Sequence, residues 1–171
     1  MVEATERKEL AEKTAADAER ERKRVSERIA EEKAVRDKAR PYLDEGRRIL
    51  RRVDREMMKA EVDRKVITPL LLRAEKKFRD ALEIDPRYAQ VQLEMGRLSL
   101  LDQAPAVDAV RWFSRAIEND PKLATAYVER VLILLEIYFR NRFDPTGKLY
   151  PLTSESRARL RQIEVDLERI Q

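Results

Sequence analysis

The side chains in this sequence that could carry chemistry are carboxylates, hydroxyls and arginines. Its 171 residues include no Cys and no His. This excludes a disulfide framework, thiolate and imidazole metal ligands, a cysteine nucleophile and a Ser-His-Asp triad. Paired carboxylates occur at Glu31-Glu32 and Asp44-Glu45, among many Lys and Arg residues and beside no apolar pocket that would shift their pKa values. We therefore predict that both pairs form solvated helix surface.

Hydroxyls, aromatic residues and glycines indicate no catalytic site either. Thr153 and Ser154 stand directly before Glu155, as residues that cap a helix do. Trp112 adjoins Phe113, and its predicted role is packing rather than stacking on a nucleic-acid base. The glycines are too scattered for a phosphate-binding loop; they are Gly46, Gly96 and Gly147. The sequence therefore predicts a protein that is not an enzyme and that binds neither cofactor nor metal.

Charged residues are numerous but balanced. Lys and Arg number 37 against 33 Asp and Glu, and 41% of all residues are charged. A nucleic-acid-binding protein usually carries a basic stripe, and this small excess predicts none. The best apolar runs, at residues 66–72 and 131–135, are far shorter than the about 20 residues of a membrane-spanning helix. Because residues 1–30 also lack an apolar signal segment, we expect a cytoplasmic protein with a protein partner, without nucleic acid or membrane.

Composition divides the sequence into two parts. Residues 1–66 contain 20 Lys or Arg and 17 Asp or Glu, whereas the longer remainder contains 17 and 16. Residues 1–40 lack Gly and Pro and are predicted to form a long charged helix. A 3-4 spacing in it resembles a heptad seam made mostly of alanines and charges: Ala11, Ala15, Ala18, Arg22, Val25, Ile29, Glu32, Arg36 and Ala39. Residues 1–38 are thus either a solvated single helix or a weak coiled coil that needs a partner, such as a second copy paired through residues 1–40.

Prolines separate helical segments in the second part. Thr68 is predicted to cap the helical segment that follows it, at Pro69. Between the prolines, apolar residues recur at three- and four-residue spacings, and no segment alternates apolar and polar residues as a strand does. The predicted fold is therefore all-α. Four prolines are each predicted to lie in the first turn of a helix, where a missing N–H costs nothing: Pro41, Pro69, Pro105 and Pro151.

Two stretches of the sequence repeat one pattern at an offset of 35 residues. Their spacings are identical: Ala74-x3-Phe78-x2-Ala81-x4-Pro86 and Ala109-x3-Phe113-x2-Ala116-x4-Pro121. This pattern, with a period near 34 residues, resembles the tetratricopeptide repeat family. The resemblance implies stacked helical hairpins in which small alanines allow close approach and the residue before each proline leaves the helix. It also implies that Phe78 and Phe113 fill the gaps between neighbouring hairpins and share one buried core.

The resemblance covers about residues 39–171 and implies a superhelix of three degenerate repeats, with Gly46 and Gly96 on the first helices of the opening and middle repeats. The opening repeat is longer than the middle one, which predicts a longer first helix and a loop near residues 61–68. Six helices and the N-terminal helix would account for the chain. The approximate repeats are 39–88, 89–123 and 124–171. Residues of the last repeat predicted to face inward, after a linker with Asp144, Pro145 and Gly147, are Ala158, Ile163 and Leu167.

The resemblance further implies a protein-binding groove lined by the first helices of the repeats. Arginines would form one edge above an apolar floor, which suits an acidic or amphipathic segment of a partner protein, since arginine binds carboxylates through two parallel hydrogen bonds. The alternative is that these arginines are ordinary exposed residues of amphipathic helices. The groove positions in this sequence are Arg40, Leu43, Arg47, Leu50, Arg51, Gln90, Leu93, Arg97, Leu100, Leu101, Thr125, Val128, Leu132, Leu135 and Glu136.

A second resemblance concerns two shorter segments. RPYLDEGRRIL at residues 40–50 and ERVLILLEIY at residues 129–138 are similar to the region beyond the catalytic domain in some large bacterial serine/threonine kinases. That similarity implies a regulatory or docking segment. No Gly-rich loop, His-Arg-Asp or Asp-Phe-Gly occurs, so the chain is not itself a kinase. We expect a non-catalytic interaction scaffold; the alternatives are such a docking segment and a structural homo-oligomer formed through the N-terminal helix.

Overall fold

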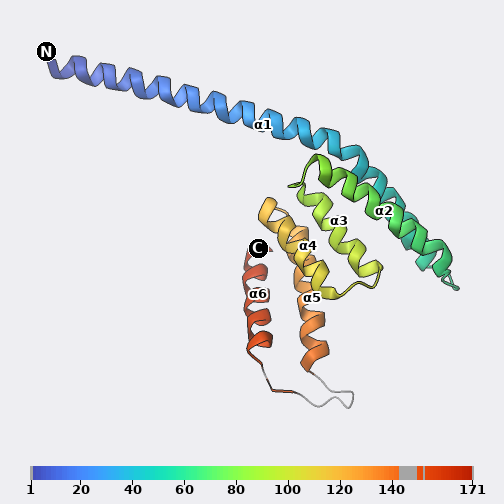
Figure 1. Ribbon diagram of the computed structural model, residues 1–171. Helices are drawn as coiled ribbons and strands as arrows, with labels where there is room; N and C mark the ends of the chain where they lie inside the picture. Colours follow the sequence, from blue (N-terminus) through green and yellow to red (C-terminus); the bar gives the residue numbers. More distant parts are fainter. Residues whose placement is uncertain (1, 143–149, 152, 171) are drawn as a thin grey trace. The chain divides into compact units, whose positions relative to one another are not determined.

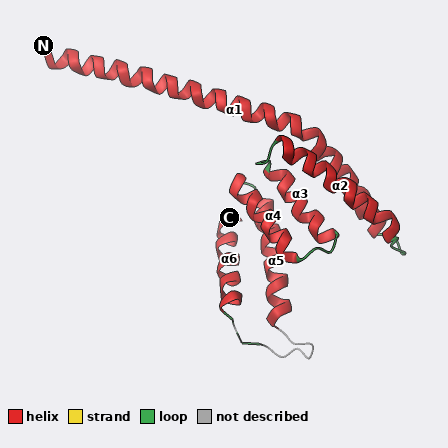
Figure 2. Cartoon of the chain, viewed as in Figure 1, coloured by secondary structure: helices red, strands yellow, loops and turns green. Residues whose placement is uncertain are grey.

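The computed structural model describes residues 2–142, 150–151 and 153–170, and every regular element in these ranges is helical (Figure 1; Figure 2). The prediction of an all-α fold is therefore confirmed. In chain order the helices are α1 (Val2–Met57), α2 (Arg64–Ile84), α3 (Ala89–Leu101), α4 (Ala106–Asn119), α5 (Ala124–Arg142) and α6 (Ser154–Ile170).

The chain divides into two units, residues 1–38 and residues 39–171. The first unit is formed by α1 alone, and its described side chains are exposed except for the half-buried Val25. The second unit contains the rest of α1 and the five other helices. It also contains all of the described residues that are buried. The second unit is thus the part of the chain that can position a binding site.

The prediction of seven helices is wrong for the described residues, because Pro41 does not begin a new helix. Pro41 lies inside α1, which continues to Met57. An interior proline disfavours a helix by about 3 kcal/mol. Here the helix continues because its neighbours are strong helix formers and because Ala39 and Leu43, on either side of the proline, are buried in the core of the second unit.

The other three prolines also lie outside the first turn of a helix. Pro69 is in the second turn of α2, which begins earlier because the Asp63 carboxylate accepts the Lys65 backbone N–H at 2.8 Å and caps the helix. Thr68 is therefore not the cap, and the loop before α2 ends at residue 63 rather than 68. Pro105 immediately precedes α4. Pro151 lies before α6, where the Thr153 hydroxyl accepts the Ser156 N–H at 3.1 Å, as the predicted cap requires.

Each of the first two hairpins closes on a glycine that faces a phenylalanine. A Cβ added to Gly46 on α1 would lie 2.3 Å from Phe78 Cε1 on α2, and one added to Gly96 on α3 would lie 2.3 Å from Phe113 Cε1 on α4. Both phenylalanines are fully buried. These contacts lie within one hairpin, because the glycine lets its two helices approach until the ring covers the backbone. Each phenylalanine also shares a buried cluster with residues of the next hairpin.

The Asp-Pro steps end the second helices of both hairpins in the same way. The Asp85 N–H donates to the Ala81 carbonyl, and 35 residues later the Asp120 N–H donates to the Ala116 carbonyl, both at 2.9 Å. Each aspartate then accepts the backbone N–H two residues on at 3.1 Å. The carboxylates thus close the turn into the next helix. The sequence repeat is therefore also a repeat of local structure.

The described buried residues form separate apolar clusters rather than the single core that we expected. Phe78 lies in the first cluster, with residues from α1, α2 and α3, and Phe113 lies in the second. The helix α3 contributes to both, with Met95 in the first and Leu93 in the second. The clusters are distinct because α3 contacts α2 on one side and α4 on the other.

The last hairpin packs α6 against α5 with an unexpected face (Figure 1). Ile163 is buried as predicted, but Ala158 and Leu167 are exposed. Ser156 and Asp166 are buried instead. The face differs because Asp166 turns inward to bind Arg130 of α5. The predicted linker residues Asp144, Pro145 and Gly147 lie outside the described residues.

Candidate binding groove

An open pocket of about 640 Å³ lies on the second unit, between α1, α3 and α5. Its apolar surface comes from Leu50 of α1 and from Leu100 and Leu101 at the end of α3. Its other lining residues are all charged: Arg47, Arg51, Asp54, Glu94, Arg97 and Glu129. The first helices of the three hairpins therefore meet at a site with an apolar floor and a charged rim.

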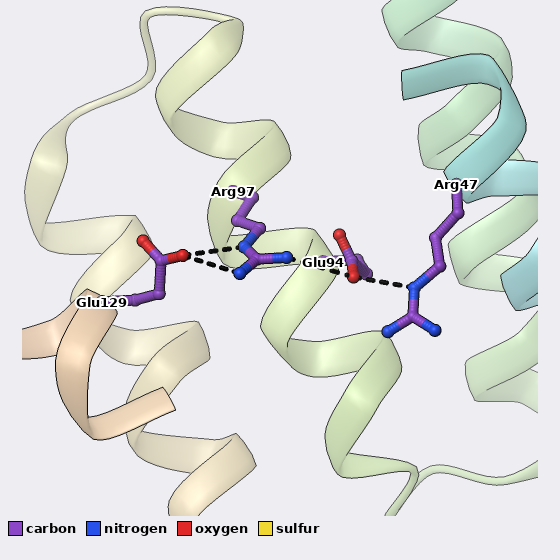
Figure 3. A network of polar contacts seen from close by, with 4 residues as sticks. All are labelled: Arg47, Glu94, Arg97 and Glu129. Carbon is purple, nitrogen blue, oxygen red and sulfur yellow. Dashed lines mark hydrogen bonds and ion pairs between the residues drawn. The ribbon is translucent and has the colours of Figure 1, made fainter. Parts of the chain in front are cut away.

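Four of the rim residues form one chain of ion pairs, which we call the Arg–Glu network (Figure 3). Arg47 Nε of α1 donates to Glu94 Oε1 of α3 at 2.8 Å. Arg97, also on α3, donates from Nε to Glu129 Oε1 of α5 at 2.9 Å, and its Nη1 lies 3.5 Å from Glu94 Oε1. The network thus joins the first helices of all three hairpins.

The Arg–Glu network is partly buried, which distinguishes it from ion pairs on the protein surface. The side chain of Glu94 is only 6% exposed, and those of Arg97 and Glu129 are 37% and 24% exposed. An ionised carboxylate with so little contact with water needs a cationic partner, and Glu94 has two. The network is therefore part of the packing between hairpins as well as part of the groove wall.

The sequence contains a pattern that identifies the network, although neither Glu94 nor Glu129 is among the groove positions that we predicted. Arg47 and Arg97 each directly follow a glycine of the closing contacts, and the two glutamates are separated by the repeat offset of 35 residues. Each arginine thus binds the glutamate of the next hairpin. The residue 35 positions after Arg97 is Leu132, so the third hairpin provides no further arginine.

The structure brings together some of the predicted groove residues. Arg47, Arg51, Arg97 and Leu101 line the pocket with Leu50 and Leu100. The predicted arginine edge needs correction, because Arg47 and Arg97 already bind glutamates of this chain. The described lining has three arginines and three carboxylates, so it is balanced in charge. Among the described ion pairs, none involves Arg51.

Other predicted positions do not line this pocket. Leu93 and Leu43 are buried in the apolar clusters and cannot contact a partner, because their side chains point toward neighbouring helices. Gln90 is exposed outside the pocket, and Arg40 lies 3.9 Å from Asp44 on its own helix. The remaining predicted positions are on α5, outside the pocket; Thr125, Val128, Leu132 and Glu136 are exposed, and Leu135 is half-buried.

The contacts of Lys77 and Trp112 indicate structural roles for both residues. Lys77 Nζ lies 2.8 Å from Glu45 Oε2, and the hydrogen bond that it donates to this carboxylate raises the pKa of Lys77 above its ordinary value of 10.5; the pair joins α1 to α2. Trp112 packs against the first cluster, with Arg115 5.0 Å from its ring centre. Within the described residues, no group of three or more acidic side chains is arranged to hold a metal ion.

Comparison with protein-family models, curated proteins and solved structures finds no match for this chain. In the described part of the chain, no helix combines the length and the apolar character needed to cross a bilayer. The tetratricopeptide and kinase-associated resemblances therefore stay predictions from the sequence.

Proposed function

We propose that the second unit is a non-catalytic interaction module that binds an amphipathic helical segment of a partner protein. The observation that supports this function most is the combination of an apolar floor and a charged rim in a pocket between three helices. A helix laid into such a groove buries its apolar residues against leucines and keeps its polar residues at the rim. The tetratricopeptide-like repeat of the sequence agrees with this use.

The charges of the groove favour an amphipathic partner over a strongly acidic one. The Arg–Glu network already satisfies Arg47 and Arg97, and a partner carboxylate would have to displace Glu94 or Glu129 to reach them. Arg51 is exposed and lines the same pocket. We therefore assign Arg51 as the rim residue that binds a carboxylate of the partner, while the half-buried Leu100 and Leu101 contact its apolar face.

Exposed apolar residues on α5 provide further contact area for the partner helix. Val128 is 39% exposed and Leu132 is 56% exposed. They are four residues apart and so lie on one face of the helix. Neighbouring exposed apolar residues commonly mark interaction surfaces. A partner helix longer than the pocket would cover them as well, and this places two of the predicted groove positions in the same interface.

A selection from a library of helical peptides tests this function. We expect the full chain to select peptides that share an apolar face and a carboxylate. Their affinity, measured by fluorescence anisotropy, should fall at least about tenfold in Leu101→Glu, which charges the floor, and by about tenfold in Arg51→Glu. The matched control is Arg48→Glu, an exposed arginine of α1 that does not line the pocket.

Two outcomes would contradict the proposal. One is that selected peptides bind Leu101→Glu and Arg51→Glu as tightly as the unchanged chain. The other is that Arg48→Glu weakens binding as much as Arg51→Glu does, which would indicate a nonspecific attraction to basic residues. We place this function in the cytoplasm, as composition predicts. A docking role within a kinase-like protein stays an alternative that uses the same groove.

A further inference from the structure

The first unit presents a stripe of side chains that are exposed except for the half-buried Val25. Ala18, Val25 and Ile29 form a shallow apolar strip on α1, flanked by Glu21, Arg22 and Ser26. Ile29 is 58% exposed. The strip follows the 3-4 spacing of a coiled-coil seam. With Glu32 and Arg36 it forms what we call the exposed seam: Ala18, Arg22, Val25, Ile29, Glu32 and Arg36.

The charges of the exposed seam exclude a parallel pair of identical helices. In a parallel, in-register coiled coil each seam residue faces its own copy. Arg22 would then face Arg22 of the second copy, Glu32 would face Glu32, and Arg36 would face Arg36. Only the layers of Ala18, Val25 and Ile29 would be free of like charges. Like charges placed together in a partly dry interface are strongly unfavourable.

Reversing one helix converts those repulsions into attractions. In an antiparallel pair in which facing residue numbers add to 54, Arg22 faces Glu32 of the second copy, and Glu32 faces its Arg22. Val25 and Ile29 then face each other in the two central layers. The outer layers pair Ala18 with Arg36, whose long side chain can cover the small residue with its methylenes. The seam therefore has an apolar centre with an ion pair on each side.

The residues beside the seam have the same preference. In the antiparallel register Glu19 comes within two positions of the level of Lys33 of the second copy, on the same flank of the seam, since their numbers add to 52. Residues at such flanking positions determine the orientation of helices in coiled coils. Opposite charges therefore meet on one flank of the seam as well as within it.

Ion pairs already present on α1 do not prevent this arrangement. Glu32 of the seam lies 3.9 Å from Arg28 of the same helix, with both side chains at least 65% exposed. Such an exposed pair contributes little to stability, so Glu32 can exchange Arg28 for Arg22 of a second copy. Arg20 pairs with Asp17 at 3.6 Å, and neither residue belongs to the exposed seam.

From this charge pattern we infer that residues 18–36 join two copies of the chain as an antiparallel coiled coil. The occupant of the seam is a second copy, because the seam is complementary to its own reverse. The aliphatic area is small, with two β-branched residues in each chain, so the dimer forms and dissociates with concentration. This interface does not depend on the proposed groove, and either function can fail without the other.

Sedimentation equilibrium of the full chain over a wide concentration range tests the dimer. We expect reversible dimerisation that Arg22→Glu weakens by about tenfold or more, because both ion-pair layers become repulsive. Glu32→Arg should weaken it equally, and the double variant with both changes should restore it. Arg24→Glu is the matched control, since Arg24 is exposed on α1 outside the seam. A monomer at all concentrations, or a dimer indifferent to Arg22→Glu, would overturn the inference.

Disulfide trapping tests the orientation, because the chain has no cysteine of its own. Ala18→Cys and Arg36→Cys chains should cross-link to each other when mixed. Ala18→Cys alone should cross-link poorly, because two copies of residue 18 would lie about 27 Å apart along the antiparallel pair at 1.5 Å per residue. Efficient cross-linking of Ala18→Cys to itself would indicate a parallel pair and would contradict the inference.

Discussion

Gly46 and Gly96 allow the first two hairpins to close around a phenylalanine ring. In the middle of a helix glycine normally costs about 1 kcal/mol relative to alanine. At these positions a methyl group would lie 2.3 Å from a ring carbon of Phe78 or Phe113, closer than carbon atoms can approach without a shift. The two glycines therefore act through close packing, and the same geometry occurs in both hairpins.

This contact reverses the usual effect of a helical Gly→Ala change. We expect Gly96→Ala to lower the free energy of unfolding by about 1–3 kcal/mol, the usual cost of overpacking a core, as measured by urea denaturation. The cost should be smaller in a Phe113→Leu background, where the ring that clashes is absent. A stabilisation of about 1 kcal/mol by Gly96→Ala, as in an ordinary helix, would show that the ring does not cover the glycine.

The burial of the two rings could be predicted from residue types and spacing, but the atoms that the rings contact could not. Phe78 and Phe113 are buried as their repeated pattern indicates. The pattern does not say which backbone atoms each ring contacts, because that depends on the approach of two helices. The 35-residue spacing of Glu94 and Glu129 is a signal for the Arg–Glu network, but these glutamates were missed for a related reason. A charged residue on an amphipathic helix looks solvated until a neighbouring helix supplies its counter-ion.

The last hairpin is joined by a buried ion pair between its helices. Asp166 of α6 is fully buried, and its Oδ2 accepts from Arg130 Nε of α5 at 2.7 Å. Arg130 also donates to Ser114 Oγ of α4 at 2.9 Å, and Gln162 donates to Asp166 at 2.9 Å. Every partner that a buried carboxylate and guanidinium need is thus present. The network determines which face of α6 turns inward.

Removal of the aspartate should be more costly than removal of the whole pair. We expect Asp166→Ala to lower the free energy of unfolding by about 3–5 kcal/mol, because it leaves the Arg130 charge buried without a partner. The double variant Arg130→Met with Asp166→Leu should recover most of that loss. Urea denaturation of the three proteins measures both effects. A loss below about 1 kcal/mol for Asp166→Ala would be that of an exposed pair and would contradict this account.

Helix type and number of hairpins could be predicted from periodicity, but helix boundaries and faces could not. Pro41 and Pro69 are predicted near helix starts, since proline is common there. Instead, α1 continues through Pro41 because its neighbours are buried, and α2 begins before Pro69 because Asp63 caps it. On α6, Leu167 is predicted to face inward, whereas Asp166 is not among the predicted core residues. Their positions are exchanged because the buried ion pair outweighs the exposure of one leucine.

The two units of the chain differ in how they use charge. In residues 39–171 the key charges are paired across helices, in the Arg–Glu network and in the Arg130–Asp166 pair. In residues 1–38 the described charges are exposed, and pairing between residues of the same helix contributes little. The second unit therefore contains its own stacking contacts and the proposed groove. The first unit presents charges that, in our inference, a second copy completes.

A double-mutant cycle on Arg97 and Glu129 tests most directly that successive hairpins are stacked by repeated Arg–Glu contacts around the groove. We predict a coupling energy of about 1 kcal/mol in urea denaturation, since contacting charges of one network interact by about 0.5–3 kcal/mol. The control cycle on Asp108 and Arg111, an exposed pair within α4, should give no more than about 0.5 kcal/mol. A coupling for Arg97 and Glu129 no larger than that of the control would contradict the account.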